Sequence, residues 1–111
     1  MTIAVREYLD ARGESPLAHW FAGLDALAAA KVATALYRLE QGNFSRVEGV
    51  GGGVYECKIN FGPGYRVYFG KDGEALIILL GGGSKKRQQT GIGMALSCWQ
   101  EYIEIAKSFF R

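Results

Sequence analysis

A single arginine stands in the middle of a mostly apolar stretch, GPGYRVYF, which runs from Gly62 to Phe69. An arginine side chain stays charged at all working pH values, and its planar fork of N–H groups can hold two oxygens of a phosphate at once. Such a group can also stabilise the negative charge that develops on phosphorus during a displacement. Arg66 is therefore the first residue for which we expect a chemical role.

A run of three cations, Lys85-Lys86-Arg87, directly follows the stretch LIILLGGGS. Taken alone, such a run is more often a solvated surface feature than a site. If the run lies beside Arg66 and Lys58, however, five like charges would repel one another, and a bound anion would stabilise them. A phosphate chain is the obvious anion for such a cluster.

Two strands joined by a tight turn are expected to position these side chains. Gly62-Pro63-Gly64 predicts a three-residue hairpin loop between strands at 54–61 and 65–70. Because side chains alternate along a strand, one face of the hairpin is then apolar. On that face the register pairs Phe61 with Tyr65, Ile59 with Val67, and Cys57 with Phe69.

The other face of the hairpin is polar. The same register sets Asn60 opposite Arg66 and Lys58 opposite Tyr68, with Glu56 beside them. One interpretation is an exposed ion pair between Glu56 and Arg66, which would contribute about 0–1 kcal/mol. The other is a binding face, on which Tyr68 could stack on a nucleic-acid base and contribute roughly 1–3 kcal/mol.

Capping residues and apolar periodicity predict the elements around the hairpin. Serine and aspartate cap helices and proline suits the first helical position, so Ser15-Pro16 and Asp25 each begin one helix of a helical hairpin. The sequence thus predicts an α+β fold in the order β-α-α-β-β-β-α, with the helical hairpin on one face of a small antiparallel sheet. Its parts are a strand at 1–8, helices from 16 to about 41, a loop at 44–53, strands at 54–61, 65–70 and 75–80, and a C-terminal helix with Ile92, Leu96, Trp99, Ile103, Ala106 and Phe110.

The composition is that of one domain. A chain of 111 residues with 49% apolar content can bury one core without structural disulfides or metal, and its net charge of +2 does not by itself mark a nucleic-acid binder. Charges at Arg6 and Glu7 precede any long apolar run, so we expect a soluble cytoplasmic protein. Cys57 and Cys98 form no CxxC motif, and His19 is expected to be structural, so we predict no metal site and no cofactor.

Taken together, these elements resemble the RelE/ParE superfamily of bacterial toxins from type II toxin–antitoxin modules, in particular the HigB-like branch of addiction module killer proteins. The resemblance extends over nearly the whole chain, so residues 1–111 are interpreted as one toxin domain. The stretches that carry it are SPLAHWFAGL, RLEQGNF, GGGVYECKINFGPGYRVYFG, LIILLGGGSKKRQ and the helix with Ile92, Ala95 and Trp99.

The resemblance implies a compact antiparallel sheet with helices packed on it. It also implies a metal-independent endoribonuclease that cleaves messenger RNA, commonly at the ribosomal A site, and thereby blocks translation. A helix-turn-helix antitoxin would neutralise such a toxin, as a heterotetramer or with a toxin homodimer. No membrane partner is expected.

The resemblance also suggests roles for individual residues. Arg66 matches the arginine held to stabilise the cleaved phosphate, Lys58 a basic position on the preceding strand, and Lys85 the basic position after the last strand. The predicted catalytic set is Arg66, Lys85, Lys58, Glu56 and Tyr68, and the predicted RNA contacts are Lys86, Arg87 and Asn60.

Two departures from the family pattern leave other functions open. The GGDK motif reads Gly82-Gly83-Ser84-Lys85, and the Asp-Ile that follows it in the branch is Gly91-Ile92, with no reactive tyrosine nearby. A ParE-like toxin that inhibits DNA gyrase by binding, or an inactive interaction domain, are the alternatives. The adjacent Phe109 and Phe110 indicate either a partner surface or a frayed end.

Overall fold

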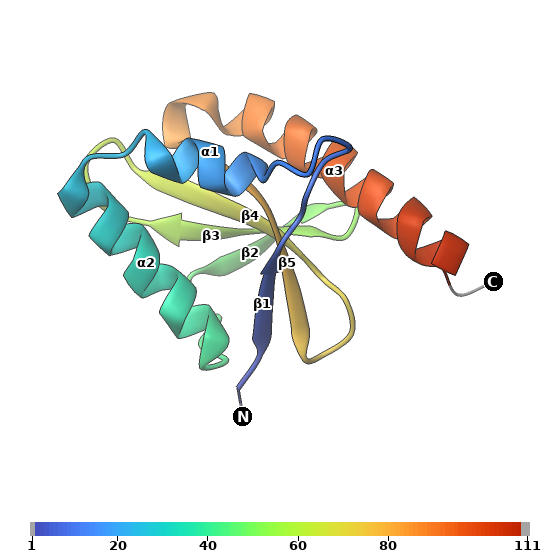
Figure 1. Cartoon of the computed structure of the whole chain (residues 1–111). Coiled ribbons are helices and arrows are strands. Elements are labelled where there is room, and N and C mark those ends of the chain that lie inside the picture. The colour runs from blue at the N-terminus through green and yellow to red at the C-terminus, as the bar shows by residue number, and fades with distance from the viewer. Residues whose placement is uncertain (1, 110–111) are drawn as a thin grey trace.

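The computed structural model describes residues 2–109, without the side chain of Phe109. Within this range the chain forms an α+β domain with a five-stranded sheet and three α-helices (Figure 1). The elements are β1 (Ala4–Glu7), α1 (Pro16–Ala22), α2 (Ala26–Glu40), β2 (Val47–Gly51), β3 (Val54–Ile59), β4 (Tyr65–Lys71), β5 (Leu76–Ser84), a 3₁₀ turn (Lys85–Arg87) and α3 (Gln88–Phe109).

The sheet is mixed rather than antiparallel. Its strand order is β1-β5-β4-β3-β2, and β1 runs parallel to β5 while the other pairs are antiparallel. The prediction of a purely antiparallel sheet is wrong at β1, because the two helices between β1 and β2 form a long connection that allows the first strand to join the far edge in parallel. The short connections between β2 and β5 give the antiparallel pairs as expected.

The glycine-rich segment predicted as a loop contains strand β2. This edge strand pairs with β3, with an irregularity between Gly49 and Gly51 where the register shifts. Gly51, Gly52 and Gly53 then turn the chain at positive φ angles. The loop prediction for 44–53 is therefore wrong at 47–51: the segment has no period of its own, and hydrogen bonds to β3 hold it extended.

The central hairpin has the predicted faces but a different register. Ile59 pairs with Tyr65 and Lys58 with Arg66, so the loop spans residues 60–64 and Asn60 does not lie opposite Arg66. The predicted pairing was off by two residues, which keeps every side chain on its predicted face because the period of a strand is two. The next strand is also longer than predicted: β5 continues through the glycines to Ser84.

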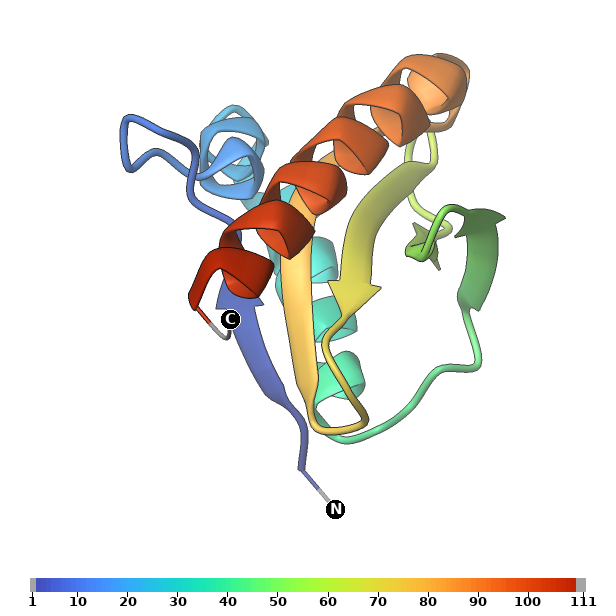
Figure 2. The same cartoon turned by 90° about the vertical axis from the view of Figure 1, so that its right-hand side faces the viewer.

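Both faces of the sheet are covered by helices (Figure 2). Helices α1 and α2 cover one face, as the prediction of a helical hairpin on one side requires; the buried residues there include Leu17, Val32, Leu39, Cys57, Ile59, Val67 and Phe69. Helix α3 covers the other face, over a smaller core of Tyr8, Val54, Tyr68, Ile78, Leu80, Ala95 and Trp99. The helix therefore lies on the face that carries Glu56, Lys58 and Arg66.

The predicted caps are confirmed. Ser15 Oγ accepts a hydrogen bond of 3.0 Å from the Ala18 N–H, and Asp25 Oδ1 accepts one of 2.8 Å from the Ala28 N–H. His19 lies exposed on α1. Phe110 and the side chain of Phe109, for which a partner surface was considered, lie outside the described residues.

Within residues 2–109, no helix combines the length and the apolar character that a membrane crossing requires.

Candidate functional site

The turn before β4 brings Arg66 and Lys85 to the same glycine. The Lys85 N–H donates a 2.7 Å hydrogen bond to the Gly64 carbonyl. A Cβ built on Gly64 would lie 3.3 Å from Lys85 Cβ and 3.9 Å from Arg66 Nη1. Gly64 has a φ of +78°, which side chains of L-residues rarely adopt. This glycine therefore sets the close approach of the lysine stem to the guanidinium.

Arg66 is buried, in contrast to the exposed ion pair that the sequence allowed. Arg66 is 6% exposed and Glu56 is fully buried. The Nε atom of Arg66 lies 3.8 Å from Glu56 Oε2. Arg66 Nη1 donates a 3.1 Å hydrogen bond to the Tyr65 carbonyl, whereas the buried Nε has no hydrogen-bond partner. An unsatisfied buried donor costs about 1–3 kcal/mol, so the long contact with Glu56 leaves this part of the guanidinium poorly satisfied.

The first turn of α3 closes this region. Gln88 Nε2 donates to both carboxylate oxygens of Glu56, at 3.1 and 2.9 Å, and the Tyr68 hydroxyl lies 3.5 Å from the Gln88 carbonyl oxygen as a long hydrogen bond. Burial raises the pKa of the Tyr68 phenol, and the nearby Glu56 carboxylate raises it further while Arg66 lowers it. We call Glu56, Arg66, Tyr68 and Gln88 the polar cluster.

Gly91 has a packing role that the sequence motifs did not indicate. A Cβ at this position would lie 2.7 Å from Tyr68 Cε2 and 2.9 Å from the Tyr68 hydroxyl oxygen. Only glycine therefore lets α3 approach the sheet while Tyr68 stays in place beneath it. Gly91 thus makes room for the polar cluster.

Two glycines of β5 leave space beside the polar cluster. Gly83 pairs with Arg66 and Gly81 with Tyr68, so they share the face that carries these side chains. A Cβ built at either glycine would meet no atom within 4 Å. The two glycines therefore leave space for small groups on the β5 side of Arg66.

The other predicted residues lie around this end of the sheet. Lys58, opposite Arg66, forms an ion pair of 3.4 Å with Glu48, and its side chain is 36% exposed. Lys85, Lys86 and Arg87 are exposed in the 3₁₀ turn, and Asn60 is exposed in the hairpin loop. The structure thus places Lys58, Arg66 and Lys85 at neighbouring backbone positions, although the Lys58 ammonium turns to Glu48. It encloses Glu56 and Tyr68 and leaves the remaining predicted RNA contacts at the periphery.

Gln88 was missed by the sequence analysis, although it ends the stretch LIILLGGGSKKRQ on which the family resemblance rests. In the sequence, the position of Gln88 three residues after Lys85 was the only indication of a role. In the structure this side chain fixes the carboxylate that faces Arg66. Such a contact joins positions 32 residues apart and has no counterpart in a local pattern.

Chemically, the arrangement can bind a phosphate and neutralise charge on it. Arg66 contributes a guanidinium group, and Lys85 contributes a second cation at the same turn. Glu56 balances the arginine within the fold, since breaking such a buried pair leaves an uncompensated charge. Lys85 is exposed and Lys58 half-buried, so these two side chains remain accessible to a ligand, whereas Glu56 and Tyr68 are enclosed.

Comparison with known proteins gives one informative relative. No protein-family model matches the chain. An uncharacterized protein of Haemophilus influenzae is 40% identical over 83 residues, which cover 74% of this chain and 84% of that protein.

Proposed function

The chain belongs to the same family as the uncharacterized Haemophilus influenzae protein, and we propose that it is the toxin of a type II toxin–antitoxin module, a HigB-like member of the RelE/ParE superfamily that cleaves messenger RNA. Strands β2 to β5 form an antiparallel sheet, and helices pack on both of its faces. This arrangement supports a RelE-like fold. The observation on which the function rests is the gathering of Arg66, Lys85 and Lys58 at one end of that sheet.

RNA cleavage by its own 2′-hydroxyl needs three contributions: in-line positioning, neutralisation of charge on the phosphorane, and two proton transfers. Arg66 supplies the second contribution. A phosphate at this turn would meet the guanidinium at Nη1, which borders Gly64, whereas Nε is enclosed 3.8 Å from Glu56 Oε2. Lys85 would share the phosphate charge, because its stem and the guanidinium border the same glycine.

Positioning falls to the remaining polar side chains at this end of the sheet. Lys86, Arg87 and Asn60 are exposed and would contact neighbouring nucleotides. Lys58 and Lys85 would move the protons, with the ribosome contributing to alignment of the strand. Glu56, Gln88 and Tyr68 then act as positioning residues that hold the guanidinium and the first turn of α3.

The deciding experiment expresses the wild type, Lys85→Ala and Arg66→Lys in growing bacteria and maps messenger RNA ends. Lys85 is exposed, so its alanine variant should fold, and Arg66→Lys keeps the charge next to Glu56 while removing the fork. We expect the wild type to stop growth and cut messages, with cutting reduced by about 10²–10³-fold in each variant. Lys107→Ala, which removes an exposed cation near the far end of α3, should cut like the wild type.

Two results contradict the proposal. Growth arrest with intact messages would discard the nuclease activity. Equal cutting by the wild type, Lys85→Ala and Arg66→Lys would discard the site.

One observation favours a second candidate, a ParE-like toxin that inhibits DNA gyrase by binding. Glu56 and Tyr68, the two predicted proton carriers other than lysine, are both enclosed. A supercoiling assay with purified gyrase separates the candidates: inhibition there, with unaltered messages in cells, would favour the ParE-like function. Activity in neither assay would leave the interaction domain as the function.

The proposed partner is a helix-turn-helix antitoxin, bound as a heterotetramer or to a toxin homodimer. A gene for such a protein next to this one, and its co-purification with the chain, would support the module. Relief of growth arrest on co-expression is the functional readout. Arrest that persists in the presence of the neighbouring gene product would argue against that partner.

A further inference from the structure

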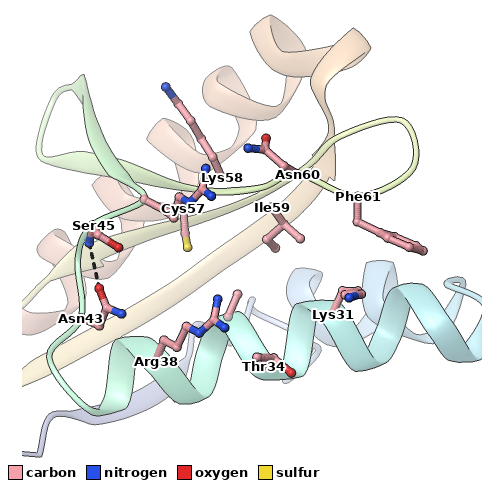
Figure 3. A pocket seen from close by; sticks show the side chains of 12 residues that line it. Lys31, Thr34, Arg38, Asn43, Ser45, Cys57, Lys58, Ile59, Asn60 and Phe61 are labelled. Carbon is pink, nitrogen blue, oxygen red and sulfur yellow. Dashed lines mark hydrogen bonds between the residues drawn. The ribbon is translucent and has the colours of Figure 1, made fainter.

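A second cationic site lies on the opposite side of β3 from Arg66, between this strand and α2. Figure 3 shows the pocket, which has a volume of about 270 Å³. Its walls come from the exposed side of α2, the loop that follows this helix, and the end of β3. This size is close to the lower end of the range of roughly 300–1,000 Å³ that is typical of small-molecule sites.

The charge of the pocket is one-sided. Lys31 and Arg38 come from α2, Arg46 from the segment before β2, and Lys58 from the rim, and no aspartate or glutamate is among the described residues that line it. Lys58 is paired with Glu48 outside the pocket, whereas the described part of the chain gives no ion pair to the other three cations. Gathered cations without carboxylates attract an anion.

The helix places its two cations on one side by spacing alone. Lys31, Thr34 and Arg38 are three and four residues apart, so they follow one stripe of α2, away from the buried Val32 and Leu39. In Figure 3 the Arg38 side chain extends from α2 toward β3, where Cys57 points into the pocket.

The loop after α2 is ordered by its own hydrogen bonds. Asn43 Oδ1 accepts a 3.1 Å bond from the Ser45 N–H, and the Arg46 carbonyl accepts a 3.0 Å bond from the Lys58 N–H. These bonds fix the backbone on both sides of Arg46. The pKa of the Cys57 thiol reflects the resulting geometry, because burial raises it while Arg38 and Arg46 both lower it. Arg38, Arg46 and Cys57 all line the same pocket.

The other end of the pocket is aromatic. Figure 3 shows Phe61 and Lys31 at this end, with Asn43 and Ser45 at the opposite end. Lys31 Nζ lies 5.5 Å from the centre of the Phe61 ring, a cation–π distance. The pocket thus offers two guanidinium groups, an aromatic ring at one end, and hydroxyl and amide groups on its walls.

We propose that this pocket binds a phosphorylated ligand of mononucleotide size, with its phosphate held by Arg38 and Arg46 and its base against Phe61. Arginine pairs recognise phosphate through parallel N–H···O bonds, and aromatic side chains stack on bases regardless of their identity. The site lies on the α2 side of the sheet, apart from the polar cluster, although Lys58 and Asn60 line it and also belong to the predicted RNA site. Nucleotide binding there does not depend on RNA cleavage. Occupancy of the pocket would then follow the concentration of that nucleotide in the cell.

The test is isothermal titration calorimetry of the purified protein with inorganic phosphate and with the four ribonucleoside 5′-monophosphates. At least one nucleotide should bind more tightly than phosphate, because only the nucleotide also contacts Phe61. Arg38→Gln and Arg46→Gln should each weaken its binding by about ten- to hundredfold, as expected for a lost charge-assisted hydrogen bond. Both residues are exposed, so the variants should fold, and Arg6→Gln on β1 is the matched control that should bind unchanged.

Modification of Cys57 gives a second readout. In a Cys98→Ser background, a bound nucleotide should slow the reaction of the Cys57 thiol with a thiol reagent. The reason is that Cys57 lines the pocket that the nucleotide would fill. Protection that disappears in Arg46→Gln would support the proposal, and an unchanged rate at saturating nucleotide would overturn it.

Three results of the titrations would also overturn the proposal. These are an absence of binding by phosphate and all four nucleotides, binding that Arg38→Gln and Arg46→Gln leave intact, and binding that is lost in Arg66→Lys but retained in Arg38→Gln. If a short RNA bound through Arg38 while no mononucleotide did, the pocket would be part of an RNA path and the small-ligand proposal would be wrong.

Discussion

Helix α3 meets the sheet in two different ways along its length. In its middle, Trp99 covers Gly70, where a Cβ would overlap the indole ring, and stacks on Tyr102 with centroids 5.2 Å apart. Its first turn instead covers the polar cluster, with Gln88 hydrogen-bonded to Glu56. Packing of large apolar groups contributes stability, whereas burying a charged pair costs desolvation that its attraction only partly offsets. The apolar middle of the helix therefore holds its polar first turn in place.

Of the changes considered, removal of the Trp99 side chain should lower the free energy of unfolding most. Trp99→Ala deletes a side chain of a residue that is 7% exposed, and such changes cost about 3–5 kcal/mol of unfolding free energy. Urea unfolding measures the loss. Met94→Ala is the control on the same helix, because Met94 is 63% exposed and its truncation should change stability by less than about 0.5 kcal/mol. Equal losses in the two variants would contradict the asymmetry.

Arg66→Gln tests the polar end. Breaking a buried ion pair costs about 3–5 kcal/mol, and we expect the lower end of this range because Gln88 still donates to the Glu56 carboxylate. The double variant Glu56→Gln with Arg66→Gln should recover part of the loss, because no charge then remains buried. A double-mutant cycle by chemical unfolding measures this coupling, and strictly additive losses would show that the 3.8 Å contact contributes no interaction energy.

Two glycines in the first turns of α3 provide a matched pair. Gly91→Ala would place a Cβ 2.7 Å from the Tyr68 ring, and such overpacking typically costs about 1–3 kcal/mol. Gly93→Ala meets no atom within 4 Å and should stabilise the helix by about 0.5–1 kcal/mol. Thermal unfolding should show a lower melting temperature for Gly91→Ala and a higher one for Gly93→Ala if α3 rests on Tyr68 as described. Changes of the same sign in both variants would contradict this packing.

The smallest expected effect concerns alkaline pH. Burial, followed by a 2.6 Å hydrogen bond to Asp72, raises the pKa of Tyr102 from 10.0 to about 12. The folded state thus favours the neutral phenol, so this contribution to stability is fully present below pH 10 and is lost as pH rises through about 12. Tyr102→Phe should lose less stability over this interval, and phenolate absorbance should show one fewer late-titrating tyrosine. An identical pH profile in both proteins would contradict the assignment.

Local patterns were sufficient for much of the fold. Ser15 and Asp25 cap their helices as predicted, because capping depends on residues only three positions apart. The hairpin faces are confirmed, since alternation survives a shift of two residues. Strand β2 was missed because its extended form depends on pairing with β3, and the parallel place of β1 was missed because no short connection indicates it.

The candidate site was predictable in its members but not in its environment. Alternation placed Glu56, Lys58, Arg66 and Tyr68 on one face, and the structure confirms that arrangement. The burial of Glu56 and Arg66 depends on where the first turn of α3 comes to rest, which is decided by Gly91 and Gln88. Such a contact between distant segments leaves no period in the sequence, so the pair was expected on an open face.

The parallel pairing of β1 with β5 sets the order in which the chain can fold. Ala4 lies beside Leu76, so roughly seventy residues must be synthesised after the first strand before it can pair with β5. Contacts between residues so far apart in the sequence slow folding. Until then β2, β3 and β4 can form a meander on their own, but the edge that receives β1 is missing. A nascent chain stalled before Leu76 should therefore remain protease-sensitive at its N-terminus, and completion of β5 would be the event that closes the domain.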